Sequence, residues 1–136
     1  MAVLLDTTVL IEAERRRYPL SRVVALADDE EPMAISAVAV AEMLLGIYLS
    51  RPSPQREHRE RFVERIIDRF DVLAFDLPVA RLYAQLWADL RRAGNLIARH
   101  DLMVAATALH HGYHVLTDNL RDFERVPSLN VRPPGW

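Results

Sequence analysis

Four short apolar runs, separated by longer stretches, set the pattern of the chain. The runs have the length and composition of buried strands, and they occupy residues 2–5, 33–36, 72–75 and 114–117. The stretches between them are long enough to cross from one strand to the next in the same direction. The pattern therefore predicts an α/β protein with a parallel sheet.

Helices are predicted between the apolar runs. Leu82, Leu86 and Leu90 recur every four residues, which is typical of a helix with one buried face. Gly94 and Gly112 are placed where helices end. The predicted helices cover residues 7–17, 20–31, 37–49, 78–94 and 100–112, and a further charged helix follows a turn over 50–60 and runs to Arg69.

Length and composition favour one domain over residues 1–136, with one hydrophobic core. The chain has 136 residues, of which 51% are hydrophobic. It contains no cysteine, which excludes disulfides and thiolate metal sites. No apolar run reaches the roughly 18 residues of a membrane span, and Asp6 interrupts the N-terminal apolar stretch, unlike a signal peptide. We therefore expect a soluble cytoplasmic protein with no membrane partner.

The charge pattern changes this picture in one respect. The net charge is −2, and all 17 basic residues are arginines. The base composition of the genome is the simpler explanation of that bias. Each basic side chain nevertheless carries a planar guanidinium group, which suits binding to phosphate or carboxylate. Because the chain has no lysine, any mechanism that needs a lysine amine is excluded.

Acidic residues cluster where the predicted strands end. Asp6 ends the first strand, and Asp118 and Asn119 follow the fourth, with Asp122 close behind. Ligand sites in an open parallel sheet form beyond the carboxyl ends of its strands. Two more acids open helices at that edge: Glu42, early in the helix after the second strand, and Asp101, at the start of the helix that leads to the fourth.

Each acid alone has an ordinary structural interpretation. Asp6 and Asp101 suit helix caps or first turns, Glu42 suits the exposed margin of its helix, and Asp118 and Asp122 suit a solvated loop. Together, however, carboxylates at one edge repel each other, and a bound divalent cation removes that repulsion. Oxygen ligands without cysteine favour Mg²⁺ or Mn²⁺, which support phosphodiester hydrolysis.

Competing sites fit the sequence less well. His110 and His114 have the i, i+4 spacing of a zinc pair, but Gly112 stands between them, and we expect both on the surface. A receiver-type phosphoacceptor site depends on a lysine, which this chain lacks.

Four blocks of the chain resemble, in order, the PIN-domain family. They read VLLDTTVLI, ISAVAVAEMLLGI, RHDLMVAATALHHG and VLTDNLRDFERVPSLNV. The similarity extends over nearly the whole chain and is strongest to VapC-type toxin ribonucleases of bacterial toxin–antitoxin pairs. It implies a three-layer α/β/α fold with a central, mainly parallel sheet of four to five strands. It also implies metal-dependent RNA cleavage, a homodimer, and inhibition by a small VapB-like antitoxin.

The resemblance also implies the site residues. Asp6, Glu42 and Asp101 match the metal-binding acids, and Asn119 matches the fourth position, with Asp122 or Asp118 supplying extra charge. Thr8, Ala39 and His100 depart from residues that are frequent in the family, without removing an acid. We hypothesise that Asp6 and Asp101 hold the metal ion, that Glu42 binds through water or acts as a base, and that cleavage leaves a 5′-phosphate.

The sequence also offers candidate residues for contacts with the substrate and with a partner protein. Thr8 is a candidate for binding substrate, and Arg91, Arg92 and Arg99 are candidates for neutralising RNA phosphates, although solvation of the surface explains these arginines equally well. Apolar residues around 9–11 and 23–26 are candidates for receiving an antitoxin or a second protomer. The alternative function is a catalytically weak PIN-fold module that binds RNA or protein.

Overall fold

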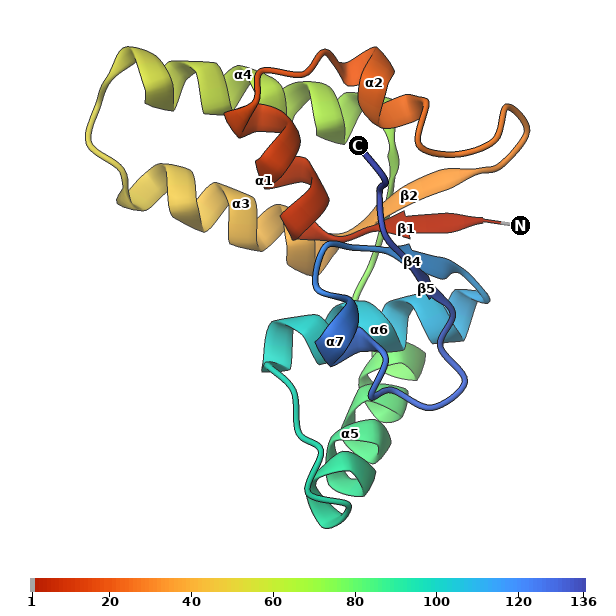
Figure 1. The fold of residues 1–136 in the computed structure, drawn as a ribbon. Coiled ribbons are helices and arrows are strands. Elements are labelled where there is room, and N and C mark those ends of the chain that lie inside the picture. The colour runs from red at the N-terminus through yellow and green to blue at the C-terminus, as the bar shows by residue number, and fades with distance from the viewer. Residues whose placement is uncertain (1) are drawn as a thin grey trace.

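Five parallel strands form the centre of the molecule in a computed structural model that describes residues 2–136. Their order across the sheet is β3-β2-β1-β4-β5 (Figure 1). The strands are β1 (Val3–Leu5), β2 (Met33–Ser36), β3 (Asp71–Leu73), β4 (His114–Leu116) and β5 (Val131–Arg132). The parallel α/β sheet predicted from the sequence is therefore confirmed. Predicted strand 72–75 is shorter and largely exposed, because it lies at the edge of the sheet.

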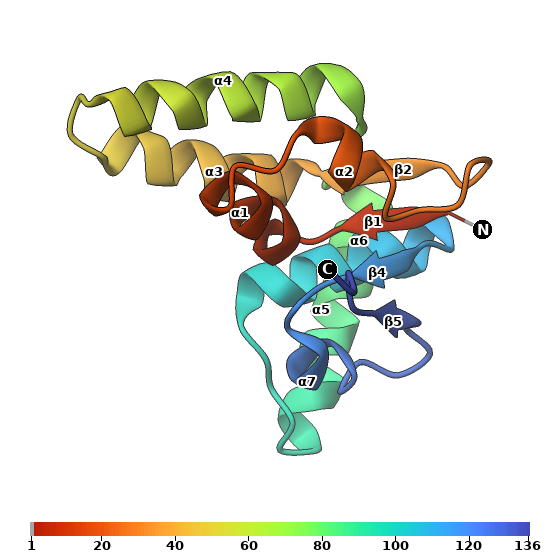
Figure 2. The ribbon, with the colours of Figure 1, turned by 45° about the horizontal axis from the view of Figure 1, so that its top comes forward.

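Helices cover both faces of the sheet, so the fold has three layers (Figures 1 and 2). One layer contains α1 (Thr7–Arg15), α2 (Leu20–Val24), α3 (Ala37–Leu49) and α4 (Pro54–Arg69). The other contains α5 (Leu77–Arg92), α6 (Arg99–His111) and α7 (Leu120–Phe123). Figure 2 shows α3 and α4 lying side by side and extending beyond the sheet as an arm.

Alternation along the strands divides the core into two halves. In β1, Val3 and Leu5 pack against α1–α4, whereas Leu4 packs against α5–α7. All three side chains have no exposed surface. Successive strand residues point to opposite faces, so a strand covered on both faces is apolar throughout, as the sequence of β1 is.

Two predicted helices have different bounds in the structure. The helix predicted over 20–31 ends at Val24, and the residues that follow form turns before β2 in which Asp28, Asp29 and Glu30 are exposed. The charged helix begins at Pro54, earlier than predicted, because Ser53 caps it by accepting a hydrogen bond from the backbone N–H of Arg56. Proline suits the first turn of a helix, where its missing N–H has no partner to lose.

Helix α6 ends as the sequence predicts. Gly112 adopts a left-handed backbone conformation with φ of 72°, which glycine adopts without steric cost. The N–H of Tyr113 then donates to the carbonyl of Ala108 at 2.8 Å and closes the helix. Among residues 2–136, no helix has both the length and the apolar character needed to cross a bilayer.

Candidate active site at the carboxyl edge of the sheet

Asp6 lies at the centre of the acidic edge. It follows β1 directly, and only 2% of its surface is exposed. Its Oδ2 accepts hydrogen bonds from Oγ1 of Thr8 and Oγ1 of Thr117, each at 2.8 Å. Two hydroxyl donors stabilise the ionised carboxylate and fix its orientation in a buried position.

The same hydroxyls attach the loop after β4 to α1. Oγ1 of Thr8 accepts from the backbone N–H of Asp118 at 3.2 Å. Oγ1 of Thr117 accepts from the backbone N–H of Asn119 at 2.9 Å. Since the hydroxyl of Thr8 already serves Asp6 and this loop, the structure gives Thr8 an orienting position. Thr117 and its role were not identified from the sequence, although its place at the end of a strand was a usable signal.

Asp101 reaches the site from the first turn of α6. The N-cap of that helix is Ala98, so Asp101 is not its cap. Nδ2 of Asn119 donates to Oδ2 of Asp101 and to Oδ2 of Asp122, each at 3.2 Å. The amide of Asn119 thus bridges two carboxylates that would otherwise repel each other.

Glu42 approaches from α3 on the other side of Asp6. Its side chain is 39% exposed, which corresponds to the margin of the helix. Oε2 accepts a hydrogen bond of 2.9 Å from Oγ1 of Thr7, and Nδ1 of His100 lies 3.6 Å from Oε1. Neither Thr7 nor the contact of His100 was recognised from the sequence, because both depend on how α3 packs against α1 and α6.

Burial and repulsion act together on Asp101. Partial burial raises the pKa of its carboxyl, and the negative charges of Asp6, Glu42 and Asp122 raise it further, to about 6. The hydrogen bond from Asn119 acts in the opposite direction. Asp122 is thus one of the acids that raise the pKa of Asp101, and Asp118 is not.

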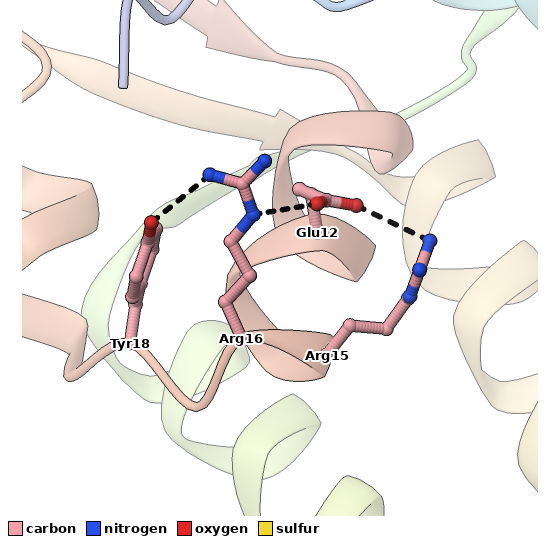
Figure 3. Close-up of polar contacts among 4 residues, drawn as sticks. All are labelled: Glu12, Arg15, Arg16 and Tyr18. Carbon is pink, nitrogen blue, oxygen red and sulfur yellow. Dashed lines mark hydrogen bonds and ion pairs between the residues drawn. The ribbon is translucent and has the colours of Figure 1, made fainter.

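Asp118 faces a different charged cluster, at the end of α1. Burial raises the pKa of Asp118, the negative charge of Glu12 adds to the effect, Arg16 opposes it, and Asp6 makes a smaller contribution that raises it. Figure 3 shows Glu12 between two arginines: it accepts from Nε of Arg16 at 2.7 Å and from Nη1 of Arg15 at 3.4 Å. Asp118 therefore borders the acidic site rather than joining Asp101.

The donors at this edge suit a hard divalent cation. They are carboxylate and amide oxygens, the ligands that Mg²⁺ and Mn²⁺ prefer, and their repulsion shows in the raised pKa of Asp101. No three acidic or histidine side chains in the described part of the chain already stand as a ready-made ligand set. The fit therefore rests on the type of donors and on their mutual repulsion.

The predicted arginines lie in the last turn of α5 and the first turn of α6. The guanidinium groups of Arg91 and Arg99 lie over the ring of Trp87, 5.3 and 5.8 Å from its centroid. Arg92 instead pairs with Asp89 at 3.4 Å. His110 lies on α6 and His114 on β4, so they form no helical pair. His110 is exposed as expected, whereas His114 is half-buried.

An apolar groove lies on the other side of Glu42, between α1, α3 and α4. Its volume is about 190 Å³. Its lining combines apolar side chains with charged ones at the rim, namely Leu10, Ile11, Glu14, Arg15, Glu42, Met43, Gly46, Ile47, Arg59, Phe62 and Val63. A docking surface was predicted around residues 9–11 and 23–26. Val9, Leu10 and Val23 are buried in the core and offer no exposed surface, whereas Ile11 is 47% exposed and lines this groove.

The fold and this acidic edge have a counterpart among known proteins. The family model described as "PIN domain" matches residues 3–129. The three-layer fold of this chain, with a parallel sheet and acids at its carboxyl edge, is therefore a PIN domain.

Individual relatives narrow the assignment. "Ribonuclease VapC" of Rickettsia bellii is 30% identical over 131 residues, which are 96% of this chain and 95% of that protein. "tRNA(fMet)-specific endonuclease VapC" of Salmonella typhimurium is 34% identical over 99 residues, 73% of each. The crystal structure of DNA-bound VapBC from Salmonella typhimurium matches with a TM-score of 0.85 and 29% identity over 98% of each chain. The chain therefore belongs to the PIN-domain family, in the group of VapC ribonucleases.

Proposed function

We propose that this protein is a metal-dependent endoribonuclease, the toxin of a cytoplasmic toxin–antitoxin pair. The observation that carries the proposal is the hydrogen-bonded set of Asp6, Asp101, Asn119 and Asp122, which joins three separate segments at one sheet edge. Relatives that share this chain's length are named ribonucleases.

Each residue of the set has a proposed role. Asp6 and Asp101 hold Mg²⁺ or Mn²⁺, and Asp122 adds negative charge that raises cation affinity. A cation held there polarises a phosphoryl oxygen and supports in-line hydrolysis. Glu42, which accepts a hydrogen bond from Thr7 and is more exposed than Asp6, would bind the cation through water or accept a proton from the attacking water. Asn119 keeps Asp101 and Asp122 together.

RNA is the proposed substrate class. One relative is named as a tRNA(fMet)-specific endonuclease, so structured transfer RNA belongs in the test beside unstructured RNA. A second function, RNA binding without cleavage, is distinguished by the same experiment.

The experiment compares the wild type with Asp6→Asn in Mg²⁺, in Mn²⁺ and in chelator. We expect wild-type cleavage with either cation, products with 5′-phosphate ends, and a loss of at least about a hundredfold in the variant. Asp68→Asn is the matched control, since Asp68 is an exposed acid on α4, away from the site. Equal cleavage by wild type and Asp6→Asn, or binding without any cleavage, would refute the nuclease assignment.

The groove between α1, α3 and α4 is the proposed seat of an antitoxin segment. The solved relative is a VapBC complex. Glu42 is among the residues that line the groove, so an occupant with a basic side chain would reach an acid of the site. Gly46 opens the groove, because a Cβ there would meet no atom within 4 Å.

Gly46→Leu tests this seat with the product of a small reading frame adjacent to the gene. We expect the variant to keep its ribonuclease activity and to escape inhibition by that product, with at least tenfold weaker binding, because the leucine fills the groove. Tight binding and full inhibition of Gly46→Leu would place the partner elsewhere.

A second copy of the chain is proposed to pack on the outer face of α3. Leu45, Tyr48 and Leu49 are 54%, 67% and 78% exposed on this helix, and adjacent large apolar side chains of this kind mark interaction surfaces. Tyr48→Glu with Leu49→Glu should convert a dimer to a monomer in sedimentation experiments. A dimer unchanged by both substitutions would exclude this face.

A further inference from the structure

We propose that Arg91 and Arg99, aligned by Trp87, form a subsite for single-stranded RNA beside the acidic site. The subsite rests on the proposed ribonuclease function, because it names where the substrate continues after the scissile phosphate. It takes one or two unpaired nucleotides and contacts both their phosphates and their bases.

The geometry is that of an arginine pair organised by one aromatic ring. Trp87 on α5 is half-buried and packs against the core between α5 and α6. Cζ of Arg91 lies 5.3 Å from the ring centroid and Cζ of Arg99 lies 5.8 Å from it. Both distances fall within the range of cation–π attraction. The ring therefore limits the freedom of two long side chains that would otherwise be mobile in solvent.

The charge of these two arginines is not neutralised by a neighbouring carboxylate. Within residues 2–136, neither Arg91 nor Arg99 has a carboxylate within ion-pair distance. By contrast, Glu12 holds Arg15 and Arg16 (Figure 3), and Asp89 holds Arg92. Arg91 and Arg99 are therefore free to neutralise phosphate, whereas Arg92 is paired with Asp89 and is left out of the subsite.

The position connects the subsite to the acids. Arg99 opens α6 two residues before Asp101, so the two residues share the first turn of the helix, although their side chains leave different faces of it. The loop of residues 93–98 descends from the start of α6 to the end of α5, where Arg91 lies (Figure 1). Nη1 of Arg125 donates to the carbonyl of Leu96 at 3.2 Å and ties this loop to the segment after α7. An RNA strand leaving Asp101 along the loop meets Arg99 first and Arg91 next.

The chemistry favours unpaired nucleotides. A guanidinium plane stacks on an exposed base and donates hydrogen bonds to the neighbouring phosphate at the same time. Bases inside a duplex do not expose their faces for stacking, so paired RNA gains only the phosphate contacts.

RNA binding in the Asp6→Asn background tests the subsite without cleavage. The probe is a fluorescein-labelled, unstructured RNA of about twelve nucleotides, titrated by anisotropy at several salt concentrations. Arg91→Ala with Arg99→Ala should weaken binding about tenfold and reduce the slope of log K against log salt by about 1.4, since each phosphate contact on a single strand contributes about 0.7. Arg81→Ala, an exposed arginine on the same helix, is the matched control and should change binding by less than about twofold.

Trp87 is tested as a positioning residue. Trp87→Phe keeps an aromatic face and should retain most of the affinity, whereas Trp87→Leu should bind as weakly as Arg99→Ala. In the Trp87→Leu background, Arg99→Ala should lower the RNA affinity little further, because both changes remove the same contact between the Trp87 ring and Arg99.

Two results would overturn the subsite. One is that the Arg91→Ala, Arg99→Ala double variant binds RNA as tightly as Arg81→Ala and shows an unchanged salt slope. This result does not depend on whether the Trp87 variants fold. The other is equal binding by Trp87→Phe and Trp87→Leu. Failure of the ribonuclease proposal appears separately, as absent cleavage in the Asp6 comparison, and leaves this binding measurement intact.

Discussion

Oγ1 of Thr117 donates a hydrogen bond of 2.8 Å to Oδ2 of Asp6, across 111 positions of the chain. Both residues follow neighbouring parallel strands: the N–H of Asp6 donates to the carbonyl of Leu116, and that of Thr117 to the carbonyl of Arg132. The contact thus exists because β4 pairs with β1. It makes the orientation of the central carboxylate depend on the order of the strands.

Thr117→Val removes this contact without changing the shape of the side chain. Asp6 loses a donor and the N–H of Asn119 loses its acceptor, so the free energy of unfolding should fall by about 1–3 kcal/mol. Urea denaturation measures the loss. Thr107→Val is the control: Thr107 is equally buried, but its hydroxyl bonds the carbonyl of Met103, which is also a helical acceptor. An equal loss in both variants would contradict the role of Thr117.

Asp101→Asn should stabilise the metal-free protein at neutral pH. The pKa of Asp101 is raised from 3.8 to about 6 in the folded protein, so the folded state binds more protons than the unfolded state between these values. Stability is therefore lost as pH rises through this window, and the full cost is present above it. In chelator, the melting temperature of Asp101→Asn should exceed that of wild type at pH 7.5 and equal it near pH 4.

The control for this pH dependence is Asp68→Asn, which changes an exposed acid on α4. Its melting temperature should follow wild type at both pH values. Added Mg²⁺ should stabilise the wild type more than Asp101→Asn, because the ion offsets the repulsion that the variant has already removed. A melting-temperature difference independent of pH would show that repulsion at Asp101 is not the cause.

Thr7→Val should impair Mg²⁺-dependent RNA cleavage more than it lowers the free energy of unfolding. Oγ1 of Thr7 is the hydroxyl donor to Glu42, and removing a group that orients a ligand typically costs about tenfold in metal affinity or activity. The measurement is the Mg²⁺ concentration for half-maximal RNA cleavage. His100→Ala, which removes the longer 3.6 Å contact to Glu42, should have a smaller effect. The reverse order would assign the orientation of Glu42 to His100.

Gly46→Ala should stabilise the protein by about 0.5–1 kcal/mol, because glycine inside a helix costs about that amount relative to alanine. The added Cβ meets no atom within 4 Å. Ala41→Gly, at an exposed position of the same helix, is the matched reverse change and should destabilise by a similar amount. Thermal denaturation of the pair measures both effects. Destabilisation by Gly46→Ala would show that the groove side of α3 does not tolerate a methyl group.

Much of the architecture could be predicted from the sequence, because its determinants are local. The apolar runs of β1 and β2 predict buried strands, and Gly112 predicts the end of α6 through its backbone conformation. The ordered blocks resembling PIN domains predicted the fold and the family, and both are confirmed. The helix predicted over 20–31 was wrong beyond Val24, where the chain forms turns that expose Asp28, Asp29 and Glu30 before β2.

The sequence by itself determined which residue types stand at the ends of the strands; only the tertiary structure decided how they are grouped. Asp118 and Asp122 lie close together in the sequence, yet only Asp122 shares the charge environment of Asp101. Thr117 contacts Asp6, and Thr7 contacts Glu42, across long separations. These contacts depend on which strands pair and how α3 and α6 pack on the sheet. Local periodicity carries no information about such pairing, because it reports only which face of its own element a residue occupies.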